Sequence, residues 1–459
     1  MAQVDAGTAG VEPQRVLLIG AGSLSAAVAE QARRWGSTVR HLPSPSDEQL
    51  RETLTQDWDV VAVVTHDDIL ALRYALLVHH IRHDIRVLVT IFDRTVGGEV
   101  VRSVPNCTVL AMTDALVPAL LGPCVAEGLL SLHRESGEYF AVADEHGEPE
   151  LARLPAKGVA RRRGLAARLV AQCRPHDATS RALLAGLAGL AAVLLLDVVL
   201  GVLVLHEPLA VAFWHAARVL TTVGTSDAAN HAASWYHTVS AMTMLAALAF
   251  AALFTAGLVD RMTSHRLTGI IGGRAVPRRS HVIVVGLGQV GLRLCQELRR
   301  LGVGVVAVER DKSAPCVALA RATGIPVVIG RGGDRFLLGR LSARRARAIA
   351  AVASDPLDNV AVAVAARAVA PDQRIVLRAG GEDDVVSESR SLFRIATVCD
   401  INRIGGAFIA ATALGLRPRA AFPAGARTWA VWETDDGHEL SDMDTGDVVG
   451  TVQDTVAVS

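Results

Sequence analysis

Two long apolar segments constrain the fold of this chain more than any other feature. The first runs from residue 182 to 205 and carries a single charge, Asp197, and the second runs from 234 to 259 with none. About 20 apolar residues cross a bilayer, and a helix of a soluble protein rarely stays apolar on every face for this long. The segments therefore predict two membrane-spanning helices, with buried core helices as the less favoured interpretation.

The charges that flank these segments predict their orientation. Five arginines lie between residues 161 and 174, five lie between 261 and 279, and the loop between the segments holds only Arg218. Cytoplasmic flanks of membrane helices are rich in Lys and Arg. We therefore expect a multi-pass protein of the cell membrane, with the lipid bilayer as a partner and both termini in the cytoplasm.

The loop between the two segments has a pattern of its own. Residues 208–220 read as a half-length helix with Pro208 near its first turn, and this helix ends directly at Thr221. The polar stretch Thr-Thr-Val-Gly-Thr-Ser-Asp follows, ending at Asp227. Irregular backbone at membrane depth is tolerated where it lines water or is buried in protein. A helix too short to span, followed by such a stretch, is typical of a re-entrant pore loop.

This order of outer helix, short helix, polar loop and inner helix resembles the two-span K⁺ channel family, through Thr221, Thr222, Val223, Gly224 and Asp227. The resemblance implies a homotetramer that conducts K⁺ or other monovalent cations past the backbone carbonyls of a filter. It assigns that ion-conducting filter to Thr222, Val223, Gly224, Thr225, Ser226 and Asp227.

The filter departs from the family pattern at two positions. Thr225 stands where the family has an aromatic residue, and Ser226 stands where it has a second glycine. Without the ring that holds the filter's width, and without a glycine's backbone freedom, the two outer ion sites should be looser. Arg218, four residues before Thr222, would oppose cation entry unless it is paired or turned away. A less selective cation pore and a degenerate pore that conducts poorly both stay open.

Two residues of the apolar segments have two interpretations each. Asp197 either faces a helix partner or a cavity, or lies close enough to one end of its helix to reach the lipid headgroups. Gly257, near the cytoplasmic end of the second segment, is either a gating hinge of the kind the family uses or a packing glycine.

A nucleotide-binding pattern follows the arginine-rich segment 261–279. The strand predicted at 281–285 runs into Gly-x-Gly-x-x-Gly at Gly286, Gly288 and Gly291, a helix follows, and the next strand ends at Glu309. Glycines so placed allow a tight turn, close approach of a phosphate, and packing of helix on strand. An acid placed like Glu309 accepts the ribose hydroxyls of an adenine nucleotide.

Further strands predicted at 326–330, 348–353 and 374–378 alternate with helices and indicate a doubly wound parallel sheet. Residues 280–414 look like the regulator-of-K⁺-conductance (RCK) domain, of the TrkA-N type. This resemblance implies that NAD(H) or another adenine nucleotide binds there as a regulator rather than a redox cofactor. The candidate nucleotide-binding residues are Gly286, Gly288, Gln289, Val290, Gly291, Glu309, Arg310 and Asp334.

The N-terminal region repeats this plan. Residues 15–25 have the same strand and glycine turn, and further strands are predicted at 38–42, 59–65 and 86–92. Residues 139–147 and 429–437 each read as a hairpin after the sheet, which suggests an internal duplication.

The two copies differ at the ligand positions. Alignment of Gly20 with Gly286 puts Ser25 opposite Gly291 and Pro43 opposite Glu309. The N-terminal copy therefore lacks the acid that would hold a ribose. We expect it to be a structural partner without a nucleotide, or to bind a different ligand.

Composition excludes several other functions. The formal net charge is zero, which gives no indication of a nucleic-acid partner, and the six cysteines form no CxxC pair, which argues against a disulfide framework or a zinc site. His281, His438 and the other histidines show no metal-ligand spacing and are predicted to be surface or loop residues. The 45 residues from 415 to 459 are too few for a dehydrogenase's second domain, so no catalytic residues and no resident metal are predicted.

The sequence therefore predicts a membrane α-helical pore module, two spans plus a re-entrant pore loop, with two cytoplasmic α/β Rossmann-like RCK domains. The expected function is a nucleotide-regulated potassium or cation channel subunit, not an enzyme. The alternative is a membrane-anchored NAD(P)-binding sensor or oxidoreductase with a vestigial, non-conducting pore. The expected parts are a disordered lead (1–13), an N-terminal RCK-like domain (14–160), a basic linker (161–180), a first span (181–206), a pore helix and filter loop (207–233), a second span (234–260), a second basic linker (261–279), a C-terminal RCK-like domain (280–415) and a small β subdomain (416–459).

Overall fold

The computed structural model describes residues 12–65, 67–91, 97–98, 102–145, 147–154, 178–221, 233–263, 279–380, 396–434 and 437–453. The chain divides into two compact units. The α/β unit combines Met1–Arg161 with Ile271–Ser459, and the helical unit is Arg162–Ile270. Each unit is described by itself.

The C-terminal half of the α/β unit is built on a parallel sheet with the strand order β11-β10-β9-β12-β13-β14. Every residue of the first strand is buried, as expected for a parallel sheet covered on both faces. The strands are β9 (His281–Val285), β10 (Gly304–Glu309), β11 (Val327–Ile329), β12 (Ala348–Ala351), β13 (Arg374–Ala379) and β14 (Thr397–Asp400). The helices between them are α11 (Gln289–Arg300), α12 (Pro315–Ala322), α13 (Arg335–Arg340) and α14 (Pro356–Val369), with a 3₁₀ turn η2 (Ala343–Arg345).

The N-terminal half has a second parallel sheet with the order β2-β1-β3-β4-β5. It matches the first sheet except for one missing strand, because the chain passes from β2 through a helix directly to the strand that corresponds to β12. The strands are β1 (Arg15–Ile19), β2 (Thr38–Leu42), β3 (Val60–Val63), β4 (Arg86–Ile91) and β5 (Cys107–Ala111). The helices are α1 (Ser23–Arg34), α2 (Asp47–Leu54) and α3 (Asp68–Ile81).

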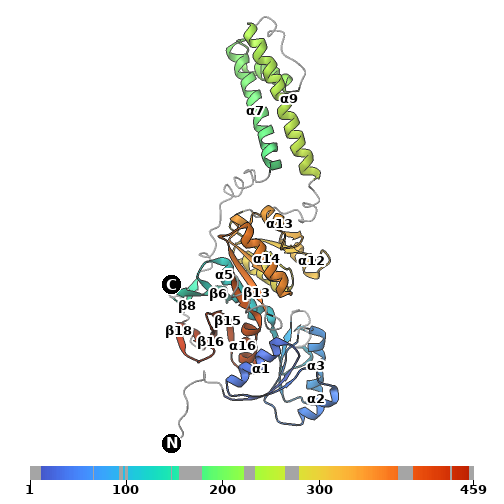
Figure 1. Ribbon diagram of the computed structural model, residues 1–459, viewed down its shortest axis with the longest axis vertical. Coiled ribbons are helices and arrows are strands. Elements are labelled where there is room, and N and C mark those ends of the chain that lie inside the picture. The colour runs from blue at the N-terminus through green and yellow to red at the C-terminus, as the bar shows by residue number, and fades with distance from the viewer. Residues whose placement is uncertain are drawn as a thin grey trace. The chain divides into compact units, whose positions relative to one another are not determined.

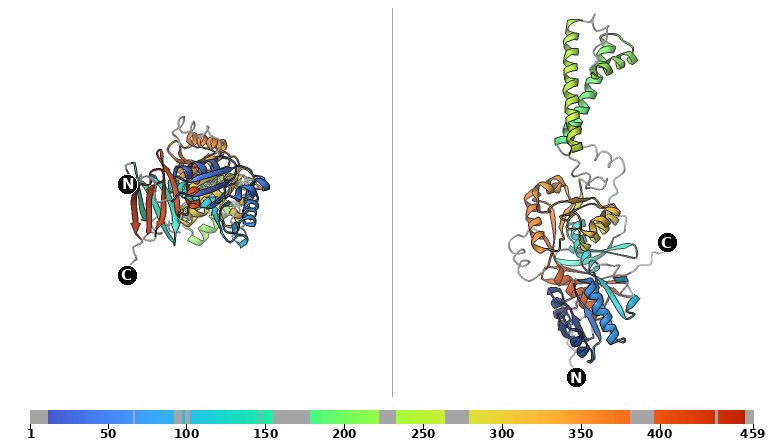
Figure 2. Two further views of the ribbon diagram at one scale, coloured as in Figure 1. Left: turned by 90° about the horizontal axis from the view of Figure 1, so that it is seen from below. Right: turned by 90° about the vertical axis from the view of Figure 1, so that its right-hand side faces the viewer.

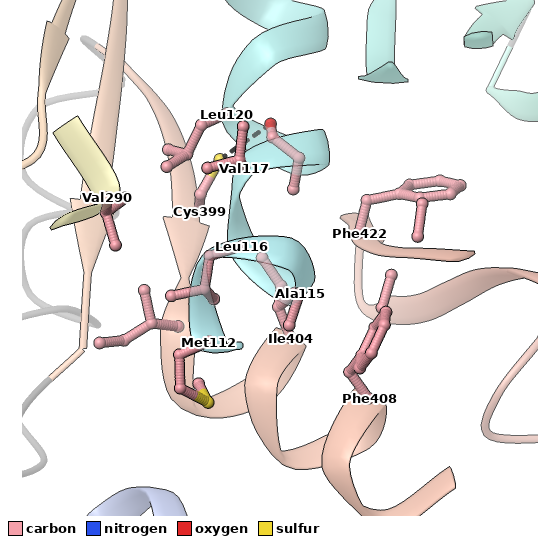
Figure 3. Packing of buried hydrophobic residues seen from close by; sticks show 14 of the residues in the cluster. Met112, Ala115, Leu116, Val117, Leu120, Val290, Cys399, Ile404, Phe408 and Phe422 are labelled. Carbon is pink, nitrogen blue, oxygen red and sulfur yellow. Dashed lines mark hydrogen bonds between the residues drawn. The ribbon is translucent and has the colours of Figure 1, made fainter. Parts of the chain in front are cut away.

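The helix that follows each sheet packs against the opposite half. Helix α5 (Met112–Val125) leaves the N-terminal sheet and contacts α11 and strands β12 and β13, while α16 (Ile401–Ala413) leaves the C-terminal sheet and contacts α1 (Figure 1). Figure 3 shows Leu116 and Leu120 of α5 beside Cys399 of β14, whose thiol donates to the Ala119 carbonyl at 3.4 Å. The two halves therefore share one hydrophobic core.

Glycines allow the second of these exchanged helices to approach closely. A Cβ added at Gly405 would lie 2.9 Å from Leu24 Cδ1, and one added at Gly406 would lie 2.8 Å from Ala27 Cβ. Both contacts are shorter than side chains tolerate, so α16 lies on α1 at a distance that only glycine permits.

Two small antiparallel sheets complete the α/β unit, with the orders β6-β7-β8 and β15-β16-β17-β18. The predicted hairpins at 139–147 and 429–437 are confirmed as the β7–β8 and β16–β17 pairs. The strands are β6 (Leu129–Glu135), β7 (Glu138–Glu145), β8 (Glu148–Leu154), β15 (Pro418–Ala424), β16 (Arg427–Thr434), β17 (Gly437–Asp442) and β18 (Val448–Gln453).

The prediction that the histidines are surface or loop residues was wrong for His133, His281 and His438. His281 opens β9 with no exposed surface, and His438 lies on β17 with 5% of its surface exposed. His281 Nε2 lies 3.0 Å from the Leu341 carbonyl, which satisfies one of its two ring nitrogens. Sequence spacing could not reveal this burial because the partner residues are distant in the chain.

The helical unit consists of α7 (Ala178–Leu203), α8 (Leu209–Leu220) and α9 (Ser234–Thr263) (Figure 2). Within the first and last, Leu183–Leu203 and Ser234–Val259 are long and apolar enough to cross a membrane. Helix α8 begins after Pro208 and ends at Leu220, so the predicted half-length helix is confirmed.

Small residues bring α7 and α9 together. A Cβ at Gly186 would lie 2.7 Å from the Phe254 nitrogen, one at Gly189 would lie 2.2 Å from the Phe250 ring, and one at Gly257 would lie 3.1 Å from the Leu183 nitrogen. Close approach of this kind is typical of helix pairs in membranes. These contacts favour the packing interpretation of Gly257.

Asp197 faces the neighbouring helix. Its side chain is half-buried and interacts with the Thr243 hydroxyl of α9. Thr243 itself is 5% exposed, so the pair lies in the contact between helices. This arrangement favours a helix partner over the lipid headgroups for Asp197.

Candidate nucleotide-binding site

The glycine-rich turn after β9 is held in a shape that other residues could not adopt. Gly286 has φ +94°, and a Cβ there would lie 2.5 Å from the Ala353 nitrogen. A Cβ at Gly291 would lie 2.0 Å from the Gly286 carbonyl oxygen. Gly286 therefore makes the turn, and Gly291 lets helix α11 lie against it.

Gly288 differs from these two glycines because nothing lies within 4 Å of a Cβ built on it. It is exposed and forms the N-cap of α11, which begins at Gln289. Helix N-termini present unpaired N–H groups and partial positive charge to anions. Open space in front of such a terminus fits the pyrophosphate of a nucleotide. Gly288 and the start of α11 therefore suit the adenine nucleotide that the glycine pattern predicts.

Glu309 connects the end of β10 to the glycine turn. Its Oε2 accepts from the Leu287 N–H at 2.7 Å, and its Oε1 accepts from the N–H groups of Arg310 and Asp311 at 2.7 and 3.0 Å. A carboxylate has about four lone-pair positions, and three are used, so one remains for a ribose hydroxyl. The fold thus places Glu309 beside the glycine-rich turn and fixes its orientation.

The other predicted site residues divide into three groups. Gln289 is exposed at the first turn of α11, whereas Val290 is 3% exposed and packs in the core, so only its backbone N–H could serve a ligand (Figure 3). Arg310 lies at the turn after Glu309 and pairs with Asp358 at 3.2 Å. Asp334 caps α13 by accepting from the Phe336 N–H at 2.8 Å, a structural role that needs no ligand.

Arg378 is a further candidate nucleotide-binding residue, and it was not predicted from the sequence. It lies near the carboxyl end of β13, and its Nη1 donates to the Val352 carbonyl at 3.4 Å. Burial lowers the pKa of Arg378 from its usual value. Ligands of doubly wound sheets bind where the strand order reverses, here between β9 and β12. The signal in the sequence was an arginine at the end of a predicted buried strand.

The glycine turn after β1 differs from the turn after β9 at the positions that the alignment predicts. Leu42 pairs with Ile19 as Val308 pairs with Val285, so Pro43 occupies the position of Glu309. Ser25, at the position of Gly291, is fully buried and donates to the Gly22 carbonyl at 2.9 Å. Gly22 has φ +101°, whereas Gly288 has φ −80°. The N-terminal turn thus has a different backbone shape and lacks a carboxylate at the ribose position.

Thr221 is the last described residue before the proposed filter. It caps α8, and its hydroxyl donates to the Ala217 and Arg218 carbonyls. The six filter residues lie outside the described part of the chain. They are Thr222, Val223, Gly224, Thr225, Ser226 and Asp227.

Glu309→Ala should weaken binding of NAD roughly 10- to 150-fold, because hydrogen bonds to a charged group contribute about 1.5–3 kcal/mol. Pro43→Ala, at the matching position of the other half, should leave the affinity unchanged. Titration of both purified variants by calorimetry checks this. Equal effects of the two substitutions would contradict the assignment of the site to the C-terminal half.

Part of the C-terminal half matches a known protein family. Residues 282–394 match the family model of the TrkA-N domain. No curated protein matches the chain. The chain resembles the structure of the GsuK RCK domain, with a TM-score of 0.49 and 13% identity over 90% of this chain and 79% of that one. It resembles the GsuK channel bound to NAD with a TM-score of 0.47 and 14% identity, over 89% of this chain and 65% of that one.

A smaller structure matches about a quarter of this chain. The TrkA-N domain of the inner membrane protein ybaL from Escherichia coli has a TM-score of 0.22 and 24% identity, over 24% of this chain and 82% of its own length. Residues 282–394 of this chain are therefore similar to a TrkA-N domain.

Proposed function

We propose that this chain is a subunit of a nucleotide-regulated cation channel, with K⁺ as the favoured permeant ion and four subunits around one pore. One observation carries the proposal. A single chain combines a glycine-rich turn that has open space at Gly288 with two long apolar helices that flank a half-length helix. A soluble dehydrogenase needs only the first feature, and a plain membrane anchor needs only a span.

The nucleotide has a regulatory role in this proposal. Gly288 and the N-terminus of α11 would hold its pyrophosphate, and Glu309 would accept its ribose hydroxyls. NAD and ADP, which the names of the GsuK structures mention, are the first nucleotides to test.

The apolar surface of the helical unit supports a place in the membrane. Large side chains on its long helices are well exposed, among them Leu195 (65%), Leu245 (64%) and Leu248 (58%). Only 22% and 17% of the two most apolar windows are buried. A core helix of a soluble protein would bury most of this surface, whereas lipid would cover it.

Helix α8 supports the pore interpretation. Its C-terminal end, at Leu220, directly precedes the proposed filter, and the C-terminus of a helix carries partial negative charge that favours cations. Arg218 lies in the last turn and acts against this charge. A cation pore with weakened selectivity agrees with both features and with Thr225 and Ser226 in the filter.

Coupling between nucleotide and pore would pass through the basic linker 261–279, which joins the inner helix to β9. We propose that the two halves of the α/β unit arose by duplication, since their strand orders match except for β11. In a homotetramer such pairs would supply eight RCK-like lobes, of which four bind nucleotide.

Purified chain in liposomes is expected to carry a K⁺ flux that changes when NAD or ADP is added. Fluorescence-based flux assays with K⁺ and with Na⁺ in the same preparation test this directly. If the protein binds nucleotide but carries no flux under any nucleotide condition, the alternative holds, a membrane-anchored NAD(P)-binding sensor or oxidoreductase with a vestigial pore.

Thr225→Tyr combined with Ser226→Gly should raise the preference for K⁺ over Na⁺ by about tenfold, equivalent to about 1.4 kcal/mol. The pair restores the ring and the glycine of the family pattern, which should tighten the two outer ion sites. Reversal potentials in planar bilayers measure the change. An unchanged ratio would mean that selectivity is not lost in the outer filter.

A further inference from the structure

Two histidines and a glutamate from distant parts of the chain meet between the two small sheets. His133 and Glu135 lie on β6 and His438 lies on β17. One potential ligand atom from each residue lies within 4.8 Å of the other two. The cluster joins the N-terminal half to the C-terminal half, because β6 and β17 belong to different halves.

Both histidines are buried, and their ring nitrogens are poorly satisfied. His133 is 7% exposed and His438 is 5% exposed. Among the described residues, no hydrogen-bond partner is found for either ring nitrogen of His133. The same holds for the Nδ1 of His438. Buried polar atoms are normally paired, and leaving one unpaired costs about 1–3 kcal/mol. A metal ion binds one nitrogen of each imidazole, so an ion bound by His133 would satisfy one of these three atoms.

The rings are fixed by packing on Phe140 of β7. Its ring centroid lies 3.9 Å from that of His438 and 5.4 Å from that of His133, stacked in both cases. This packing holds both imidazoles in place within the cluster.

The glutamate is oriented by a separate cation. Arg419 Nη2 lies 2.8 Å from Glu135 Oε1, while Glu135 Oε2 lies 2.7 Å from His438 Nε2. Arg419 thus holds one carboxylate oxygen and leaves the other turned toward the imidazole. Carboxylates and imidazoles that bind metals are usually held by such outer contacts. A metal ion here would replace the proton that Glu135 and His438 share.

We propose that His133, Glu135 and His438 form a binding site for a divalent transition metal ion, with Zn²⁺ as the best match. Two imidazole nitrogens and one carboxylate are typical donors for Zn²⁺, whereas Ca²⁺ and Mg²⁺ prefer oxygen alone. His133 and Glu135 also line a cavity of about 840 Å³, and we expect a water molecule from it as the fourth ligand. The bound ion links β6 to β17 and so stabilises the contact between the two halves.

The test uses the full-length protein in detergent, stripped with a chelator and titrated with Zn²⁺ against a chromophoric competitor. We expect one ion per chain and a higher unfolding temperature with Zn²⁺ than without it. His438→Gln and Glu135→Gln should each weaken Zn²⁺ binding by roughly 100-fold or more, since even outer contacts alter metal affinity about 10- to 100-fold. Ca²⁺ and Mg²⁺ should not raise the unfolding temperature.

His281→Gln is the matched control, because it removes another buried histidine on a strand outside the cluster. It should leave Zn²⁺ affinity unchanged. Co²⁺ in place of Zn²⁺ should give the visible absorption of a tetrahedral N,O site in the unchanged protein, a readout that does not depend on any variant folding. The proposal is overturned if the unchanged protein binds less than one ion, or if His281→Gln weakens binding as much as His438→Gln.

Discussion

Gly288→Val is expected to lower the affinity for NAD roughly 150-fold or more while the chain stays folded. The new side chain would stand in front of the N-terminus of α11, where nothing now lies within 4 Å of a Cβ. It would block the close approach of the pyrophosphate and remove at least two charge-assisted hydrogen bonds, about 3 kcal/mol or more. The backbone at Gly288, with φ −80° and ψ −169°, is open to any residue, so folding should not suffer.

Calorimetric titration with NAD measures this loss, and the unfolding temperature reports on folding. Gly450→Val is the matched control, since Gly450 on β18 also has open space around it and lies outside the nucleotide site. It should bind NAD normally. Normal binding by Gly288→Val would show that the pyrophosphate does not lie at this turn.

Lowering the pH from 7 to 5 is expected to cost about 2 kcal/mol of unfolding free energy through His281 alone. Burial lowers its pKa to about 4, although the contact with the Leu341 carbonyl acts in the opposite direction. The unfolded chain titrates near the ordinary value of about 6.5. Between these two values the unfolded state binds a proton that the folded state does not, so stability is present above pH 6.5 and declines as the pH falls.

Urea unfolding at pH 7 and pH 5 tests this, with His281→Gln compared to the unchanged protein. The variant should lose about 2 kcal/mol less than the unchanged protein over this range. His80→Gln serves as the control because His80 is exposed, and it should behave like the unchanged protein. If His281→Gln shows the same pH dependence as the unchanged protein, His281 is not a buried neutral histidine.

The features that the sequence predicted best are local ones. The turn at Gly286, the helix after it and Glu309 lie within 24 residues, and their geometry follows from glycine chemistry and strand periodicity. Apolar length alone predicted the two long helices, and Pro208 and Thr221 correctly bounded α8.

The features that it could not predict depend on contacts between distant segments. Every residue of helix α5 except Asp114 is buried, and its placement between the two halves explains this apolar composition (Figure 3). His133 and His438 have no recognisable spacing because they belong to different sheets.

The most direct test of the central claim measures K⁺ flux in liposomes for the unchanged chain and for Gly288→Val, each with and without NAD. The account predicts that both proteins conduct and that NAD changes the flux of the unchanged chain alone. The same NAD response in both proteins, or no flux from either, would contradict the claim that a nucleotide at the C-terminal glycine turn controls a cation pore.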